Sequence, residues 1–176
     1  SQDSPAVAIE PSEKMLSLPL STQKQPVFLY GAGHVGRAVV EIARHLPCQI
    51  YWVDTNDNRY PEDIAEEVTK LLANKPETIA QHAPGDAIHL IMTYSHQVDF
   101  EIVMAVLSCG NFARCGLIGS ETKASRFRKR LRDAGVNSDA IERLSCPIGL
   151  PEITGKKPLQ VAISVTGQLS NWLETK

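Results

Sequence analysis

Cysteine is scarce in this sequence, and its spacing does not suggest a zinc site. The four cysteines, Cys48, Cys109, Cys115 and Cys146, are scattered through 176 residues, and none belongs to a C-x-x-C pair of the kind that binds zinc. No metal site is therefore expected. Without a secretory signal, reduced thiols and a cytoplasmic location are the expectation. Cys48 and Cys109 are best interpreted as small buried apolar residues.

Long apolar runs and a large excess of one charge are also missing. No run approaches the roughly 20 apolar residues that cross a bilayer. The first residues, SQDSPAVAIEPSEK, have neither the basic nor the apolar region of a signal peptide. The net charge of −2 does not favour nucleic acid. Neither a membrane nor nucleic acid is therefore an expected partner of what reads as an ordinary globular chain.

Short apolar runs alternate with helix-like patterns, which predicts an α/β fold. Residues 1–25 form a lead-in segment with a candidate edge strand at 6–9, and residues 26–176 form one domain. The expected strands are 26–30, 49–53, 68–72, 87–93 and 114–118, and the expected helices are 35–46, 62–67, 76–82, 99–108, 121–134, 139–144 and a last one from Pro158. Right-handed crossovers then predict a doubly wound, Rossmann-like parallel sheet, strand order 3-2-1-4-5, with helices on both faces.

The segment GAGHVG, after the first expected strand, fits the pattern G-x-G-x-x-G. Gly31 permits a tight turn, Gly33 lets the main chain approach a phosphate, and Gly36 lets the helix pack on the strand. The free N–H groups at the start of the helix favour an anion. His34, inside the motif, points either at a ligand phosphate or at solvent.

Asp54 ends the second expected strand, about 20 residues beyond the glycines, which is the spacing of a ribose-binding carboxylate. A carboxylate at this position repels a 2′-phosphate, so NAD is favoured over NADP. The alternative is a solvated loop acid among Asp57, Glu62 and Asp63.

Two further loops are expected beside the glycine loop. Ligands of doubly wound sheets lie beyond the carboxyl ends of the strands, where the strand order reverses. Of the basic run 121–134, only the cation in its first turn is a candidate, because the others are typical of a solvated helix face. The crevice is therefore expected to contain Thr93, His96, Asp99, Gly119, Ser120 and Lys123.

His96 and Asp99 are the candidate catalytic residues. An imidazole beside a carboxylate can transfer protons. The alternative is that Ser95 and Asp99 cap a helix while His96 faces water.

Four segments, GAGHVG, TYSHQVD, GLIGSETKASRFRKRL and CPIGLP, together resemble the xanthine dehydrogenase accessory proteins of the XdhC type, from about residue 26 to the C-terminus. The resemblance implies a cofactor chaperone that binds molybdenum cofactor (molybdopterin), assists its sulfuration with a cysteine desulfurase and delivers it to xanthine dehydrogenase. It also implies a preceding domain, so the chain is expected to be a C-terminal half or a shortened form.

The sequence departs from the family pattern at three positions. Asn56 stands where many relatives have Arg, with Arg59 following later; Tyr94 replaces a His, and Pro151 replaces an acid. These departures bear on polar recognition more than on the fold.

Other interpretations stay open. The glycine loop suits the phosphate of a pterin cofactor as well as that of NAD, so an NAD-dependent oxidoreductase and an NAD-sensing regulatory module are alternatives. Few residues remain for a substrate domain, which weighs against the oxidoreductase. Cys146, ahead of Cys115, is a candidate soft ligand in the crevice; otherwise it is a structural thiol. The chain is compatible with a homo-oligomer.

Overall fold

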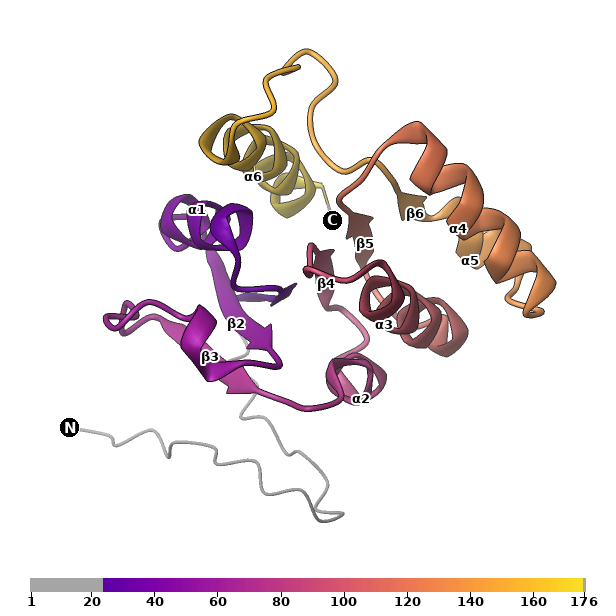
Figure 1. Cartoon of the computed structure of the whole chain (residues 1–176), viewed down its shortest axis with the longest axis horizontal. Coiled ribbons are helices and arrows are strands. Elements are labelled where there is room, and N and C mark those ends of the chain that lie inside the picture. The colour runs from indigo at the N-terminus through magenta and orange to yellow at the C-terminus, as the bar shows by residue number, and fades with distance from the viewer. Residues whose placement is uncertain (1–23, 176) are drawn as a thin grey trace.

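A six-stranded parallel sheet organises residues 24–175, the part of the chain that the computed structural model describes (Figure 1). The strand order is β3-β2-β1-β4-β5-β6, which confirms the expected order and adds one strand beyond β5. The candidate edge strand at 6–9 lies outside the described residues. The strands are β1 Gln25–Tyr30, β2 Cys48–Asp54, β3 Val68–Leu72, β4 Ile88–Ile91, β5 Arg114–Leu117 and β6 Leu144–Ser145.

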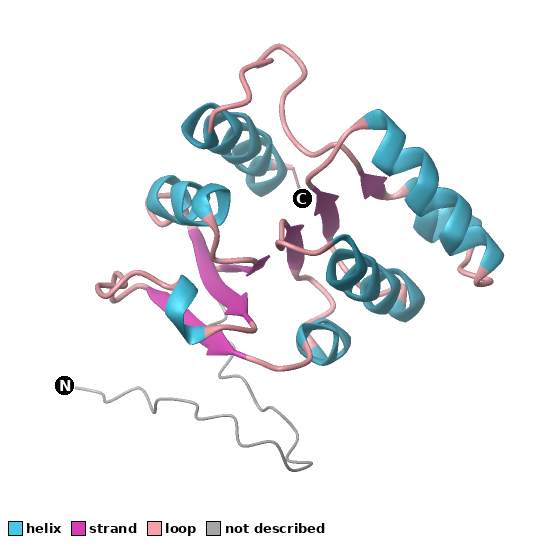
Figure 2. Cartoon of the chain, viewed as in Figure 1, coloured by secondary structure: helices cyan, strands magenta, loops and turns pink. Residues whose placement is uncertain are grey.

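Helices cover both faces of the sheet (Figure 2). One face carries the pair α1 and α6, and the other carries α2, α3, α4 and α5, so the core divides into two apolar clusters. A short 3-10 helix, η1, lies between β2 and β3. The helices are α1 His34–Ala43, η1 Asp57–Arg59, α2 Pro76–His82, α3 His96–Cys109, α4 Glu121–Asp133, α5 Ser138–Glu142 and α6 Pro158–Glu174.

The central strand β1 shows why the sheet needs both layers. It pairs with β2 on one side and β4 on the other. Val27 and Leu29 pack against the cluster of α1 and α6, whereas Phe28 and Tyr30 pack against the cluster of α2 and α3. A parallel strand buried on both faces is apolar at consecutive positions, as the segment VFLY is.

Three expectations about the elements are wrong. Residues 62–67 form no helix, because Ile64 and Ala65 alone pack against the core and a turn then leads into β3. Helix α1 ends at Ala43 rather than Leu46, since backbone near a proline disfavours helix. The expected helix at 139–144 ends at Glu142, and the next residues form β6.

Strand β6 is only two residues long, so its sequence carries no strand pattern. Leu144 pairs with Cys115, and Ser145 pairs with Gly116. No helix among residues 24–175 has the length and apolarity to cross a bilayer.

A hydrogen-bonded Tyr–His pair lies inside the apolar cluster on the α3 side. The Tyr30 Oη and His89 Nδ1 atoms are 3.0 Å apart, and both side chains are buried. His89 also stacks on Phe28. Burial lowers the pKa of His89 to about 3, because a charged imidazolium in this apolar layer would lose its hydration.

Acid should therefore destabilise the fold through His89. The unfolded chain binds a proton at an imidazole pKa of 6.5, whereas the folded chain does so only near pH 3. The stability that His89 contributes is complete above pH 6.5 and is lost as the pH falls toward 3, at about 1.4 kcal/mol per pH unit. Urea unfolding between pH 7 and pH 4 measures this slope.

The comparison variant is His89→Gln, whose amide keeps a partner for Tyr30 but does not titrate. Its unfolding free energy should fall less steeply with acid than that of the unchanged chain. The exposed His45 gives the control His45→Gln, which should keep the original slope. Equal slopes for His89→Gln and the unchanged chain would show that His89 is not the titrating group.

Candidate functional site

Three loops meet at the carboxyl edge of the sheet, as the expected topology requires. The backbone N–H of Met92 donates to the carbonyl of Tyr30, and that of Ile118 donates to the carbonyl of Ile91. These bonds bring the loops after β1, β4 and β5 side by side. The edge between β1 and β4, where the chain order reverses, is therefore the candidate site.

The glycine loop is shaped by close backbone contacts at two of its glycines. Gly31 has φ +116°, and a Cβ there would lie 2.3 Å from the carbonyl oxygen of Met92; a Cβ on Gly36 would lie 2.0 Å from that of Gly31. Gly33 differs, because a Cβ there would meet no neighbouring atom within 4 Å. Gly31 and Gly36 are needed for packing, while Gly33 leaves open space at the start of α1.

The open space faces N–H groups that no side chain caps. Gly33 is the N-cap residue of α1 and has no side-chain cap bond, whereas Ser95 caps α3 and Ser120 caps α4. His34, the first residue of α1, is exposed. The uncapped N–H groups and the helix dipole make this turn suited to an anion.

Asp54 is buried, with 5% of its surface exposed, so the alternative of a solvated loop acid is wrong. Its Oδ2 accepts a hydrogen bond from the N–H of Ala32 at 2.7 Å. Its Oδ1 accepts from the N–H of Asn56 at 2.9 Å and from Arg59 Nη1 at 2.8 Å. The carboxylate thus holds the glycine loop to the end of β2, and Arg59 balances its charge.

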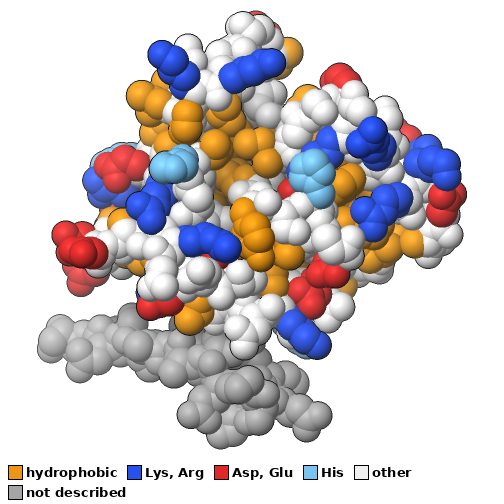
Figure 3. All heavy atoms as spheres, viewed as in Figure 1, with side chains coloured by type: hydrophobic (Ala, Val, Ile, Leu, Met, Phe, Trp, Pro, Cys, Tyr) orange, Lys and Arg blue, Asp and Glu red, His pale blue; other side chains and the backbone are white. Residues whose placement is uncertain are grey.

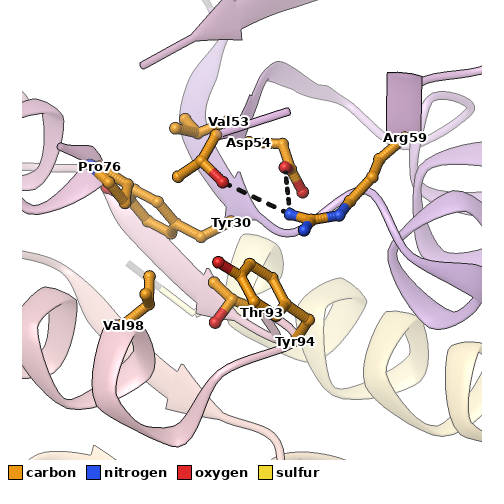
Figure 4. A pocket seen from close by; sticks show the side chains of 9 residues that line it. Tyr30, Val53, Asp54, Arg59, Pro76, Thr93, Tyr94 and Val98 are labelled. Carbon is orange, nitrogen blue, oxygen red and sulfur yellow. Dashed lines mark hydrogen bonds and ion pairs between the residues drawn. The ribbon is translucent and has the colours of Figure 1, made fainter. Parts of the chain in front are cut away.

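Arg59 and Tyr94 form a stacked pair across the site (Figure 4). The guanidinium carbon of Arg59 lies 3.9 Å from the centre of the Tyr94 ring. Arg37, on α1, donates to the backbone carbonyl of Arg59 through Nε at 2.8 Å. Neither Arg59 nor Tyr94 was among the residues expected in the site, although Tyr94 is a departure from the family pattern and Arg59 follows the departure at Asn56.

Thr93 and Lys123 form one network with the buried Asp99. Asp99 is 1% exposed; its Oδ1 accepts from the N–H of Thr93 at 2.9 Å and from the hydroxyl at 2.7 Å. Its Oδ2 accepts from Lys123 Nζ at 2.7 Å, and the same ammonium donates to the carbonyl of Ile118 at 2.9 Å. The ion pair therefore ties the loop after β4 to the loop after β5.

The proton relay between His96 and Asp99 is not formed. Within residues 24–175, the Asp99 carboxylate bonds Thr93 and Lys123 and makes no hydrogen bond to His96. The Ser95 hydroxyl caps α3 by accepting from the N–H of Val98 at 3.3 Å, and His96 is exposed. The alternative explanation is right for Ser95 and His96, whereas Asp99 is an ion-pair partner rather than a cap.

The loop after β5 presents its main chain, more than its side chains, at the candidate site. Gly119 and Ser120 are exposed, and the Ser120 hydroxyl accepts from the N–H of Lys123 at 3.2 Å. Lys123 itself is turned toward Asp99. The other cations of α4 lie mostly on its outer surface (Figure 3), as expected of a solvated helix face.

The buried cysteines are poor thiolate ligands. Burial raises the pKa of Cys115 to about 12 and that of Cys146 to about 11. Cys48 is buried as expected, but the expectation for Cys109 is wrong: it ends α3 and is exposed. The structural interpretation of Cys146 is therefore favoured over a soft ligand in the crevice.

Comparisons with known proteins agree with this fold. The family model described as the XdhC Rossmann domain matches residues 27–169. The uncharacterized protein YqeB of Escherichia coli (strain K12) is 28% identical over 142 residues, 80% of this chain and 26% of YqeB. A crystal structure named as a xanthine dehydrogenase from Bacillus halodurans has a TM-score of 0.72 and 22% identity, covering 87% of this chain and 44% of that chain. The chain thus spans about a quarter of the first protein and under half of the second.

Removing the ammonium group of Lys123 should destabilise the fold far more than removing the ammonium group of an exposed lysine. Lys123→Met leaves the Asp99 charge buried without its partner, and we expect a loss of about 3–5 kcal/mol in unfolding free energy. Denaturant unfolding measures this loss.

The matched control lies on the same helix. Lys129 pairs with Asp133 at 2.6 Å, but their side chains are 72% and 62% exposed, so Lys129→Met should cost less than about 1 kcal/mol. The double variant Lys123→Met/Asp99→Asn should regain much of the stability. Similar losses for the two single variants would contradict the buried ion pair.

One of the four cysteines should react with a thiol reagent much faster than the other three. Cys109 is exposed, whereas burial raises the pKa of Cys48 to about 11 and protects the other two in the same way. At pH 8, a disulfide reagent should therefore modify Cys109 quickly and the rest only on unfolding. Cys109→Ser should abolish the fast phase; a fast phase that persists would mean that a second thiol is accessible.

Proposed function

Because this chain belongs to the family of XdhC Rossmann domains, we propose that it is a cofactor-binding accessory module of xanthine dehydrogenase. In this role it binds molybdenum cofactor, assists its sulfuration together with a cysteine desulfurase, and hands it to xanthine dehydrogenase. We place this work in the cytoplasm, where unpaired cysteines such as these four stay reduced.

The observation that carries this proposal is the open turn at Gly33. Molybdenum cofactor is a pterin with a phosphate and a dithiolene, and the uncapped N–H groups at the start of α1 suit its phosphate. His34 stands at the same helix start and can add a donor. We call the uncapped N–H groups around Gly33, at the start of α1, the anion seat. When bound there, the cofactor supplies the metal chemistry, and the chain supplies the binding site.

The buried side chains support a binding role over turnover. Asp54 and Asp99 are both neutralised by cations of the chain itself, and within residues 24–175 His96 makes no hydrogen bond or ion pair to a carboxylate. Burial raises the pKa of Cys115 to about 12 and that of Cys146 to about 11, so neither thiol is a ready thiolate ligand for molybdenum. NAD remains a second candidate ligand, because the same turn suits its pyrophosphate.

Gly33→Val should weaken cofactor binding without unfolding the chain. The position has φ −77° and ψ −171°, which valine adopts readily, so the unfolding free energy should change by about 1 kcal/mol or less. The valine side chain fills the space that a phosphate needs, and the affinity for molybdopterin should fall about tenfold or more. Equilibrium dialysis of molybdopterin against each variant measures the affinity.

Two control variants distinguish a loss of ligand binding at Gly33 from a loss of the fold. Ser125→Val adds the same side chain at an exposed position of α4 and should leave affinity unchanged. Gly36→Ala should destabilise the fold, because its Cβ would lie 2.0 Å from the carbonyl of Gly31. Unchanged molybdopterin affinity in Gly33→Val would exclude this turn as the seat, and NAD-dependent hydride transfer by the purified chain would replace the chaperone role with catalysis.

A further inference from the structure

The outer surface of α6 carries a patch of apolar side chains. Among residues 24–175, the large apolar side chains that are exposed are Leu72, Tyr94, Leu159 and Ile163. Leu159 is 60% exposed and Ile163 is 47% exposed, and residues four apart are neighbours on one face of a helix. Figure 3 shows apolar side chains gathered over α6. One exposed leucine is ordinary, but this pair, which we call the α6 patch, forms a continuous apolar surface.

Helix α6 also lacks charge. Of its 17 residues, Pro158–Glu174, only the last is charged. Helix α4 is the opposite, since six of its 13 residues are Lys or Arg, and α1 exposes Arg37 and Glu41. A surface helix normally turns charged side chains to water, whereas the cores of protein interfaces are poor in charge. The composition of α6 is therefore typical of a helix that is covered.

The chain itself covers only part of α6. Ala162, Val165 and Leu169 are fully buried in the apolar cluster shared with α1 and the sheet. On a second side the preceding loop packs against the helix, and the Ser164 hydroxyl donates to the carbonyl of Leu150 at 3.1 Å. Neither residue of the α6 patch belongs to the apolar clusters of the core. The patch is the part of α6 that residues 24–175 leave uncovered.

We propose that the α6 patch is the contact between two copies of this chain, whose α6 helices cross antiparallel about a two-fold axis. In such a contact, residue i of one copy meets residue j of the other, and residue j meets residue i. When the crossing is centred on the patch, Leu159 of each copy packs against Ile163 of the other. This contact needs neither a cofactor nor a client enzyme, so it does not rest on the proposed function.

Charge favours a second copy as the occupant of the patch. A surface that binds its own copy brings like charges together wherever it is charged, so two α4 helices would repel each other. Helix α6 has no charge before Glu174, so two α6 patches meet without repulsion. A strongly acidic or basic partner would instead leave its charges unpaired against this helix.

The lysines just before α6 determine the direction of the crossing. Lys156 and Lys157 are exposed and precede the patch, so parallel helices would place these ammonium groups beside their copies. In an antiparallel crossing centred between Leu159 and Ile163, the two copies of Lys157 lie about 12 Å apart along the helix axis. This separation exceeds the Debye length of about 8 Å at physiological salt. The antiparallel crossing therefore avoids the repulsion.

Sedimentation equilibrium from about 1 to about 100 μM tests for this dimer. We expect a monomer–dimer equilibrium. Leu159→Glu and Ile163→Lys should each raise the dimer dissociation constant about hundredfold, because a two-fold contact contains each changed residue twice. The matched control is Leu72→Lys on β3, at a side chain that is 45% exposed, and it should leave the dissociation constant unchanged. A thermal melt checks that each variant is folded.

Mixing two charged variants tests the antiparallel pairing. In a mixed dimer of Leu159→Glu with Ile163→Lys, one contact joins the two new opposite charges and the other keeps the original pair of apolar side chains. The mixture should therefore regain most of the dimer, with both chains in equal amounts, which native mass spectrometry detects. A mixture of Leu159→Glu with Ile163→Glu brings like charges together at one contact and should stay dissociated.

Three results would overturn the proposal. The first is a chain that stays monomeric at every concentration; if Ile163→Lys then weakens binding to xanthine dehydrogenase, the patch belongs to that partner. The second is a dimer that both charged variants leave intact. The third is a dimer that both variants dissociate but that their mixture does not restore, which would exclude the antiparallel α6 pairing. Because no cofactor takes part in these measurements, each result leaves the anion seat at Gly33 to its own test.

Discussion

The ligand-facing edge of this domain depends on one buried carboxylate. Asp54 joins the glycine loop, 22 residues earlier in the sequence, to the turn that follows β2: its carboxylate accepts from Ala32 on one side and from Asn56 and Arg59 on the other. A buried carboxylate without such partners would be very unfavourable. The same bonds therefore satisfy the charge and set the position of the loop, so stability and binding geometry share one cause at this edge.

The features predictable from the sequence were those that local patterns determine. The glycines of GAGHVG fix a turn by backbone geometry alone, and apolar runs such as VFLY require a sheet covered on both faces. The alternation of strands and helices predicts parallel strands joined by right-handed crossovers, and the order of five of them is the one common to doubly wound sheets. Strand β6 could not be predicted, because two residues are too few to show an alternating pattern. Residues 62–67 are rich in acidic side chains, which suggested an exposed helix, but they contain too few apolar residues to pack a helix against the sheet.

The sequence predicted the positions of the site residues better than their hydrogen-bond and ion-pair partners. Thr93, Asp99 and Lys123 lie at the expected edge, but spacing along the chain says nothing about which side chain neutralises which. Asp99 meets Lys123, 24 residues later, rather than the neighbouring His96, because the first turn of α3 directs its carboxylate inward and His96 outward. Arg59 and Tyr94 come from different loops, and only the three-dimensional structure brings them together.

This distribution of charges bears on what the domain can do. A general acid or base needs a group whose proton is available and a partner that tunes it. Here both buried carboxylates are neutralised by cations of the chain, while the exposed His34 and His96 stand at helix starts without carboxylate partners among the described residues. What remains available to a ligand is the main chain, through the uncapped N–H groups around Gly33. Such a surface suits an anion, which is consistent with the role proposed above for this domain.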